Sequence, residues 1–211
     1  TAIEPGSTFK LASLMACMEA GMASTDSVDT GDGEIFFYNQ RMRDSNHKDG
    51  GHGEISLGKC FEVSSNVGSA LAVKETFGDK PQAFLNQLKA IGVTEKTGIR
   101  YVGEASPKVK TSVDDRAWTG LSLTQMAIGY EVTQTPLQTL ALYNAVANNG
   151  RMMRPQLVSE LKSGTEVVKS YQPFILNPRI CNATTLAACQ KMMEAVCDPQ
   201  GEGTASRLFK D

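Results

Sequence analysis

The stretch Glu4-Pro5-Gly6-Ser7-Thr8-Phe9-Lys10, continuing into Leu11-Ala12-Ser13-Leu14-Met15-Ala16, decides how the rest of the chain is interpreted. Pro5-Gly6 signals a turn, and the apolar residues after it have helical spacing. Ser7 lies where this helix is predicted to begin, and Lys10 follows three residues later on the same face. Because helical side chains lean toward the N-terminus, we expect the Lys10 ammonium to point back at the Ser7 hydroxyl. This arrangement is typical of a nucleophilic serine activated by lysine.

The Ser-x-x-Lys spacing alone is weak evidence, because it also occurs at Ser45, Ser56 and Ser159. Ser45 lies in a polar, Gly-rich run, and Ser159 lies in strand-like sequence. Ser56 could cap a helix. Only Ser7 has a turn before it and a long apolar-faced helix after it, although an ordinary helix cap is the alternative explanation.

Composition narrows the possible classes. With 211 residues, 41% hydrophobic and 21% charged, the chain is long enough for one large globular domain or two small ones. A net charge of −2 gives no basic surface for nucleic acid, so no nucleic-acid partner is expected. No apolar run reaches the length of a membrane span, and no signal peptide is present.

The cysteines and histidines suggest no metal, and no cofactor is expected. The five cysteines are odd in number and form no Cys-x-x-Cys pair, so structural free thiols are favoured over a disulfide or a catalytic thiol. Cys17, Cys189 and Cys197 lie in or beside helical patterns, where a buried thiol is usual. His47 and His52 lie in a Gly-rich loop and have no third ligand.

Helical periodicity is the commonest pattern along the chain. Besides the opening helix, which should end near Gly21, helices are predicted over 54–63, 66–77, 79–91, 121–128, 137–148 and 184–196. A strand is predicted over 34–42, and a hairpin over 152–160 and 165–171 with Ser163-Gly164 at the bend. Residues 24–33 and 44–53 are predicted as loops.

A second group of polar residues is Ser64-Ser65-Asn66, the only Ser-x-Asn in the chain. Alone, it is an ordinary helix cap. Together with Ser7 and Lys10, Ser64 could relay a proton between Lys10 and a leaving amine. Asn66 could donate to and accept from a substrate amide or Lys10 itself.

These motifs resemble those of the penicillin-binding transpeptidase family, and more narrowly the class B, division-type enzymes. The resemblance covers nearly the whole chain. Further segments carry it: Thr97-Gly98-Ile99 through Gly103-Glu104, Ala127-Ile128-Gly129-Tyr130, Thr135-Pro136-Leu137-Gln138, and Ala147-Asn148-Asn149-Gly150 followed by Pro155. The family is α+β, with helices packed on a central antiparallel sheet.

The resemblance implies a peptidoglycan D,D-transpeptidase that cross-links stem peptides in septal wall synthesis. Ser7 would form the acyl-enzyme by attacking the penultimate D-Ala carbonyl, with Lys10 as general base. Ser64 would pass the proton to the departing amine, and Asn66 would hold the substrate amide. β-Lactams would acylate the same serine. The parent protein would be anchored at the periplasmic face of the bacterial inner membrane, in contact with division proteins.

The family's third motif, Lys-Thr-Gly or Lys-Ser-Gly, should follow the last helix. Lys96-Thr97-Gly98 comes too early and matches a different family segment. We therefore expect residues 1–211 to be a partial, helix-rich transpeptidase domain with most of the central sheet missing and with impaired activity. The opening helix would then lie against an exposed apolar surface.

Two other classes share the first motifs. A serine β-lactamase needs a glutamate that activates the deacylating water, but no Glu-x-x-x-Asn run follows Asn66. A β-lactam sensor or a non-catalytic division scaffold is the other alternative. Steady-state hydrolysis of a chromogenic β-lactam would identify a β-lactamase. Transfer of the acyl group to an acceptor amine would distinguish a transpeptidase from a sensor or scaffold.

Overall fold

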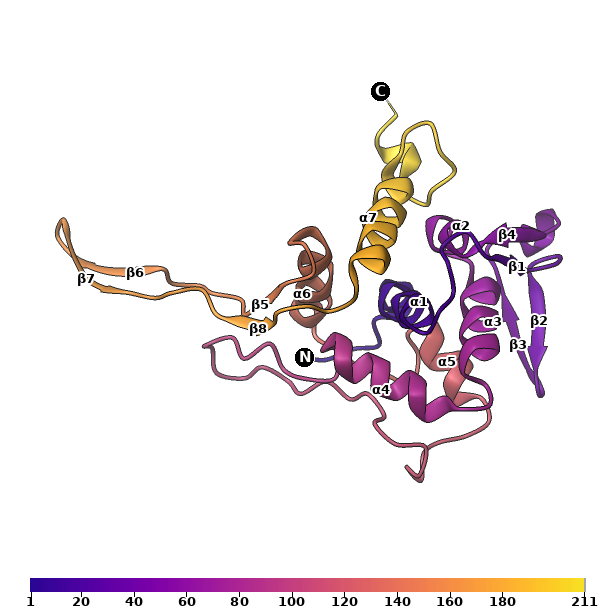
Figure 1. Ribbon diagram of the computed structural model, residues 1–211, viewed down its shortest axis with the longest axis horizontal. Helices are drawn as coiled ribbons and strands as arrows, with labels where there is room; N and C mark the ends of the chain where they lie inside the picture. The colour runs from indigo at the N-terminus through magenta and orange to yellow at the C-terminus, as the bar shows by residue number, and fades with distance from the viewer. Residues whose placement is uncertain (211) are drawn as a thin grey trace.

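The computed structural model describes residues 1–210, and helix α1 (Lys10–Glu19) lies at the centre of its main body (Figure 1). Every residue of α1 from Lys10 to Met18 is buried, so the helix is covered on all sides. The expectation that it lies against an exposed apolar surface is therefore wrong. Five helices surround it: α2 (Leu57–Glu62), α3 (Asn66–Phe77), α4 (Pro81–Ile91), α5 (Ser122–Ala127) and α7 (Ala183–Cys197).

The helix boundaries follow strong local signals. Helix α6 (Pro136–Ala147) begins with a capping box, in which the side chains of Thr135 and Gln138 each accept from the other's backbone N–H. Helix α4 has Pro81 in its first turn, and Gly92, whose φ is +99°, caps its C-terminus. Because such caps are visible in the sequence, α3 to α7 begin and end within two residues of their predicted limits.

Within residues 1–210 the strands form antiparallel pairs, and no sheet has more than two strands. This agrees with an α+β chain in which a large central sheet is missing. The pairs are β1 (Ser27–Asp29) with β4 (Glu54–Ser56), β2 (Glu34–Phe37) with β3 (Gln40–Arg43), β5 (Met152–Met153) with β8 (Ile175–Asn177), and β6 (Glu160–Ser163) with β7 (Glu166–Ser170).

Three predicted segments need correction. The single strand over 34–42 is a hairpin, because the chain turns at Tyr38, which adopts a φ of +55° that is rare for an aromatic residue. The predicted loop over 24–33 contains strand β1, which is too short to show the two-residue hydrophobic period of a strand. The helix predicted over 54–63 begins only at Leu57, because Ser56 caps it by accepting from the Lys59 N–H at 3.1 Å.

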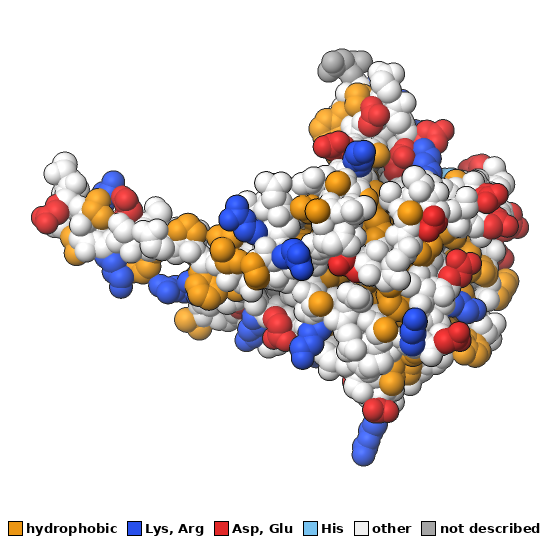
Figure 2. Space-filling model, in the orientation of Figure 1, with side chains coloured by type: hydrophobic (Ala, Val, Ile, Leu, Met, Phe, Trp, Pro, Cys, Tyr) orange, Lys and Arg blue, Asp and Glu red, His pale blue; other side chains and the backbone are white. Residues whose placement is uncertain are grey.

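The β6–β7 hairpin projects away from the helices as a narrow ribbon (Figure 1). Its bend lies at Gly164, after Ser163, so the predicted hairpin is confirmed. The predicted strand over 152–160 is interrupted, since 154–159 belong to neither β5 nor β6. All nine residues of β6 and β7 are exposed, and hydrophobic and charged side chains are interspersed over the ribbon (Figure 2).

All five cysteines are free thiols within the described part of the chain. Four are buried, but Cys197 at the end of α7 is exposed, contrary to expectation. Burial raises the pKa of Cys60 to about 12, so this thiol stays protonated near neutral pH. In residues 1–210 no cluster of His, Cys, Asp and Glu could hold a metal ion, and no helix is both long and apolar enough to cross a membrane. Asp211 lies outside the described residues.

Candidate active site

Ser7 lies in a 3-10 turn, Gly6–Phe9, that leads directly into α1. The Ser7 carbonyl accepts from the Lys10 N–H, and Gly6 has a φ of +56° that glycine adopts without strain. The Ser7 side chain is exposed, and within residues 1–210 it makes no hydrogen bond. The hydroxyl is therefore accessible to a substrate.

A second turn, Gly129 to Glu131, packs against the Gly6–Phe9 turn that carries Ser7 (the Ser7 turn). The Gly6 N–H donates to the Gly129 carbonyl at 3.2 Å, and the Glu131 N–H donates to Oε1 of Glu4 at 3.1 Å. A Cβ at Gly129 would lie 2.0 Å from the Gly6 carbonyl oxygen, so only glycine allows this approach. The two turns therefore form one unit that fixes the position of Ser7.

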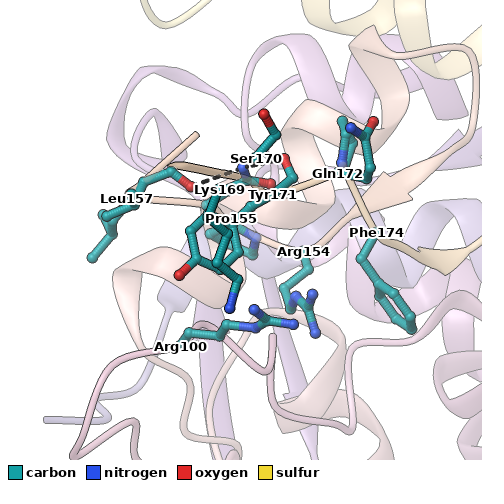
Figure 3. Close-up of a pocket in the computed structure, with 12 residues that line it drawn as sticks. Arg100, Arg154, Pro155, Leu157, Lys169, Ser170, Tyr171, Gln172 and Phe174 are labelled. Atoms are coloured by element: carbon teal, nitrogen blue, oxygen red, sulfur yellow. Dashed lines mark hydrogen bonds between the residues drawn. The ribbon is translucent and has the colours of Figure 1, made fainter. Parts of the chain in front are cut away.

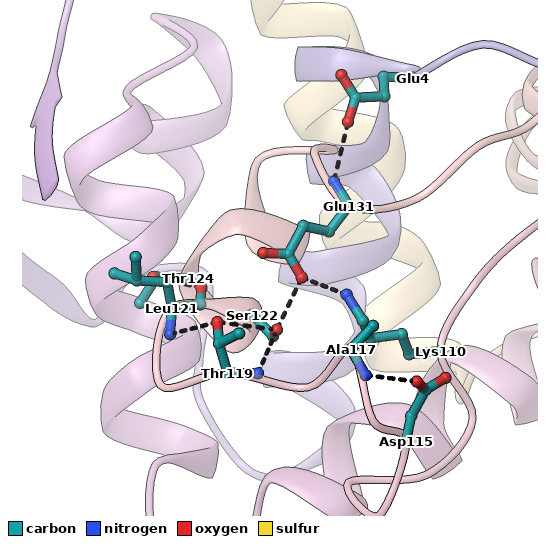
Figure 4. A network of polar contacts seen from close by, with 9 residues as sticks. All are labelled: Glu4, Lys110, Asp115, Ala117, Thr119, Leu121, Ser122, Thr124 and Glu131. Carbon is teal, nitrogen blue, oxygen red and sulfur yellow. Dashed lines mark hydrogen bonds and ion pairs between the residues drawn. The ribbon is translucent and has the colours of Figure 1, made fainter.

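The Glu131 side chain holds this second turn in place (Figure 4). Its Oε2 accepts from the Ser122 hydroxyl at 2.7 Å and forms an ion pair with Lys110. Ser122 in turn accepts from the Thr119 N–H at 2.9 Å. Glu131 has a φ of +55°, a strained value that these contacts offset.

Gly129→Ala is expected to disrupt the Ser7 turn more than the fold. The new methyl group meets the Gly6 backbone and forces φ = +82° on an alanine. We expect the acylation by β-lactams that the family resemblance implies to fall at least about tenfold, while the melting temperature drops by only a few degrees. Stopped-flow acylation and thermal unfolding measure the two effects. Gly164→Ala, at the exposed ribbon bend with φ = +63° and open space around it, is the control. Unchanged acylation in Gly129→Ala would show that the contact does not position Ser7.

Lys10 is buried one turn after Ser7, and its Nζ donates three hydrogen bonds. The acceptors are the Ser64 carbonyl at 2.6 Å, the Ser64 hydroxyl at 3.0 Å and Oδ1 of Asn66 at 2.8 Å. Within residues 1–210 no hydrogen bond joins the Lys10 ammonium to the Ser7 hydroxyl. Three acceptors on the α2–α3 junction engage the ammonium, and its predicted direction toward the Ser7 hydroxyl stays a prediction.

The α2–α3 junction presents Ser64 to Lys10. Ser64 has a φ of +57°, a conformation rare for residues other than glycine and often found at functional sites. Ser65 caps α3 by accepting from the Gly68 N–H at 2.8 Å. The structure thus brings Lys10, Ser64 and Asn66 together, as the sequence predicted, and places Ser7 at the start of the same helix as Lys10.

Asp44 is the site residue that sequence reasoning missed. It was placed in a loop, yet it is 3% exposed and its carboxylate accepts from the Ser65 hydroxyl at 2.6 Å. It also accepts from the N–H groups of Asn66 at 2.6 Å and Val67 at 3.0 Å, at the N-terminus of α3. Nothing in the local sequence indicated this, because the partners lie more than twenty residues away.

Burial and charge act in opposite directions on Lys10. Removal from water favours the neutral amine and lowers the pKa of Lys10 to about 8. The negative charge of Asp44 works against this by favouring the ammonium. A lysine with a pKa near 8 has a substantial neutral fraction around physiological pH, as a general base requires.

Lys96-Thr97-Gly98 belongs to a loop, not to a strand beside Ser7. Glu104 accepts from the N–H and hydroxyl of Thr97 at 2.7 and 2.8 Å and from the Gly98 N–H at 3.0 Å. Gln138 at the start of α6 also donates to Glu104. These contacts close the loop onto α6, which agrees with the assignment of this motif to a different family segment.

The whole described chain, residues 1–210, matches the family described as penicillin binding protein transpeptidase domain. The chain therefore belongs to this family. It is 28% identical over 202 residues to penicillin-binding protein PbpB of Mycobacterium tuberculosis. This match covers 94% of this chain and 28% of the relative. It is 23% identical over 206 residues to peptidoglycan D,D-transpeptidase FtsI of Escherichia coli. That match covers 97% of this chain and 31% of the relative.

A solved structure shows the same fold. Penicillin-binding protein A of M. tuberculosis, as a ceftriaxone acyl-enzyme complex, superposes with a TM-score of 0.77 at 22% identity. The match covers 92% of this chain and 42% of that protein. The chain thus spans less than a third of these two curated relatives and under half of that solved chain.

Proposed function

We propose that this chain is part of a serine D,D-transpeptidase that cross-links peptidoglycan stem peptides and is acylated by β-lactams. The observation that carries the proposal is the buried Lys10 ammonium, held by Ser64 and Asn66 one turn after the accessible Ser7 hydroxyl. Family membership supports it, as do its relatives, which include a D,D-transpeptidase and a protein solved as a β-lactam acyl-enzyme.

The first half-reaction forms an ester. The Ser7 oxygen bonds to the carbonyl carbon of the penultimate D-Ala while its proton moves to neutral Lys10. The tetrahedral intermediate then breaks its C–N bond, and a proton returns through Ser64 to the departing D-Ala amine. In the second half-reaction the amine of a neighbouring stem peptide attacks the ester carbonyl and gives up a proton to Lys10. The C–O bond to Ser7 then breaks, and Lys10 returns that proton to the Ser7 oxygen.

The Lys10 hydrogen bonds are compatible with these proton transfers. An ammonium has three N–H groups, and all three have acceptors here, so the arrangement accommodates charged Lys10. When Lys10 is neutral it has one lone pair, and the Ser64 hydroxyl can rotate to donate to it. Ser64 then accepts in one protonation state and donates in the other, which is the requirement for a relay.

Asn66 orients Lys10 in this structure. Its Oδ1 accepts from Lys10 at 2.8 Å and its Nδ2 donates to the Arg43 carbonyl at 2.8 Å. One N–H and one lone pair remain, and we assign these to the substrate amide. Asn66 would thus hold the base and the substrate with one side chain.

We further propose that residues 1–211 are part of a transpeptidase domain that carries two of the family's three motifs. The third motif would come from sequence outside this chain and would supply the substrate-carboxylate contact and an oxyanion donor. Losing one such donor costs about 2.7–4 kcal/mol of transition-state stabilisation. The parent protein would act in septum formation at the periplasmic face of the inner membrane, in contact with division proteins.

The test uses the purified protein that contains this chain. Transfer of an acyl group from a D-Ala-D-Ala peptide to a D-amino acid acceptor is expected, with little steady-state hydrolysis of a chromogenic β-lactam. Acylation without transfer would favour a sensor or scaffold, and rapid β-lactam turnover would favour a β-lactamase.

The acylation rate should rise with pH. Neutral Lys10 is the active form, so the rate increases as pH passes through the Lys10 pKa of about 8 and levels off above it. Pre-steady-state acylation by penicillin from pH 6 to 10 measures the profile. Asp44→Asn removes a charge that favours the ammonium, so its midpoint should lie lower. A wild-type midpoint above 10 would contradict a desolvated Lys10 base.

A further inference from the structure

A cavity of about 630 Å³ opens at the base of the ribbon, where the β5–β8 pair gives way to β6–β7 (Figure 3). Residues 154–158 and 169–174 line it, together with Arg100 from the loop after α4. Ser7, Lys10, Ser64 and Asn66 take no part in its walls, so it is separate from the proposed active site. Its volume is within the range of sites that hold small molecules or short peptide segments.

The cavity gathers positive charge without a counter-charge. Arg100, Arg154 and Lys169 line it, and no acidic side chain does. Within residues 1–210 none of the three forms a salt bridge. The chain as a whole carries a net charge of −2, so this concentration is local. Three like charges around one hollow favour an anionic ligand.

Aromatic rings hold these cations in position. The Arg154 guanidinium lies 4.4 Å from the centre of the Phe174 ring. Arg100 and Lys169 lie 5.6 and 4.9 Å from the Tyr171 ring. Figure 3 shows the ends of Arg100 and Arg154 turned toward one another. A guanidinium group held against an aromatic ring loses less side-chain entropy when a ligand binds. Its parallel N–H donors match the two oxygens of a carboxylate.

The backbone around the cavity also has free donors. The ladder between the two strand pairs is interrupted, and the Gln156 amide bridges the gap by donating to the carbonyls of Val158 and Tyr171 at 2.9 and 3.0 Å. Among residues 1–210 no backbone carbonyl accepts from the N–H groups of Leu157, Val158, Gln172 or Phe174. Exposed strand-like segments with free N–H groups accept an added strand readily.

We propose that this cavity binds an extended, acidic peptide segment of a partner protein. One carboxylate of the segment lies between Arg100 and Arg154, and its backbone pairs with the open stretch of the ribbon. Apolar side chains of the segment pack on Leu157 and Phe174, which are 70% and 51% exposed. The free backbone donors and apolar walls favour a peptide over a simple inorganic anion.

Fluorescence anisotropy with a labelled, capped heptapeptide that alternates valine and glutamate tests this proposal on the purified protein. We expect saturable binding that weakens with added salt, and binding at least about tenfold weaker for the same peptide with glutamine in place of glutamate. The double variant Arg100→Gln/Arg154→Gln should lose at least about tenfold in affinity. The matched control Arg41→Gln/Arg116→Gln, which removes two exposed arginines elsewhere, should bind normally.

Penicillin acylation should be unchanged in both double variants, which shows that they are folded. Absence of binding, equal affinity for the two peptides, or an unaffected Arg100→Gln/Arg154→Gln variant would overturn the proposal. Displacement of the peptide by an equal concentration of inorganic phosphate would also overturn it, because the site would then bind any small anion.

Discussion

Lys10→Met is expected to lower the rate of acylation by penicillin by about 10²–10⁴-fold, the usual contribution of a general base. Methionine retains the length and apolar contacts of the buried stem but cannot accept a proton. Stopped-flow measurement of the acylation rate, with circular dichroism to confirm folding, provides the test. Lys59→Met is the control, because Lys59 lies on α2 in an ion-pair cluster with Glu62 and Glu202. Less than a tenfold loss in Lys10→Met would contradict the general-base role.

Lys10 and Ser64 should act as one unit, because the hydroxyl relays protons only while the amine is present. Ser64→Ala alone should slow acylation strongly, and adding it to Lys10→Met should change the rate little. Acylation rates of the two single variants and the double variant form a complete cycle. Losses that add fully in free energy would mean that the two groups work independently.

Asp44→Ala is expected to have the largest effect on stability, about 3–5 kcal/mol. Removing the carboxylate leaves the Ser65 hydroxyl and two N–H groups of α3 without their acceptor in a buried place. The α2–α3 junction then loosens, so acylation should fall as well. Urea unfolding and acylation kinetics measure the two effects.

Asp32→Ala is the control for Asp44. Asp32 is exposed and accepts a single backbone hydrogen bond, from Glu34. We expect a loss below about 1 kcal/mol there. Asp44→Asn keeps an acceptor oxygen and should fall between wild type and Asp44→Ala. A cost at Asp44 as small as that at Asp32 would show that the buried carboxylate does not hold the Ser64–Asn66 segment.

The sequence predicted what is locally encoded. Helices α3 to α7 were recognisable because caps such as Thr135 and helix-compatible prolines such as Pro81 lie in the chain itself. Lys10, Ser64 and Asn66 were recognisable because their spacing matches the motifs of a known family. Lys10 and Ser64 do meet, although they are separated by 54 positions.

What the sequence could not predict depends on distant partners. Asp44 looked like a loop residue because its hydrogen-bond partners lie on another element. The hydrogen bond from the Lys10 ammonium to the Ser64 carbonyl was missed, because helix geometry relates Lys10 only to its neighbours in sequence. The turn at Tyr38 was missed because its positive φ is unusual for tyrosine.

The account rests most directly on Ser7 as the acylated residue, and peptide mass spectrometry of the penicillin adduct decides the matter. After brief incubation and digestion, the added mass is expected on the peptide that contains Ser7, and Ser7→Ala should remove it entirely. A label on Ser45, Ser56 or Ser159, each of which shares the Ser-x-x-Lys spacing, would contradict the account, as would a label that persists in Ser7→Ala.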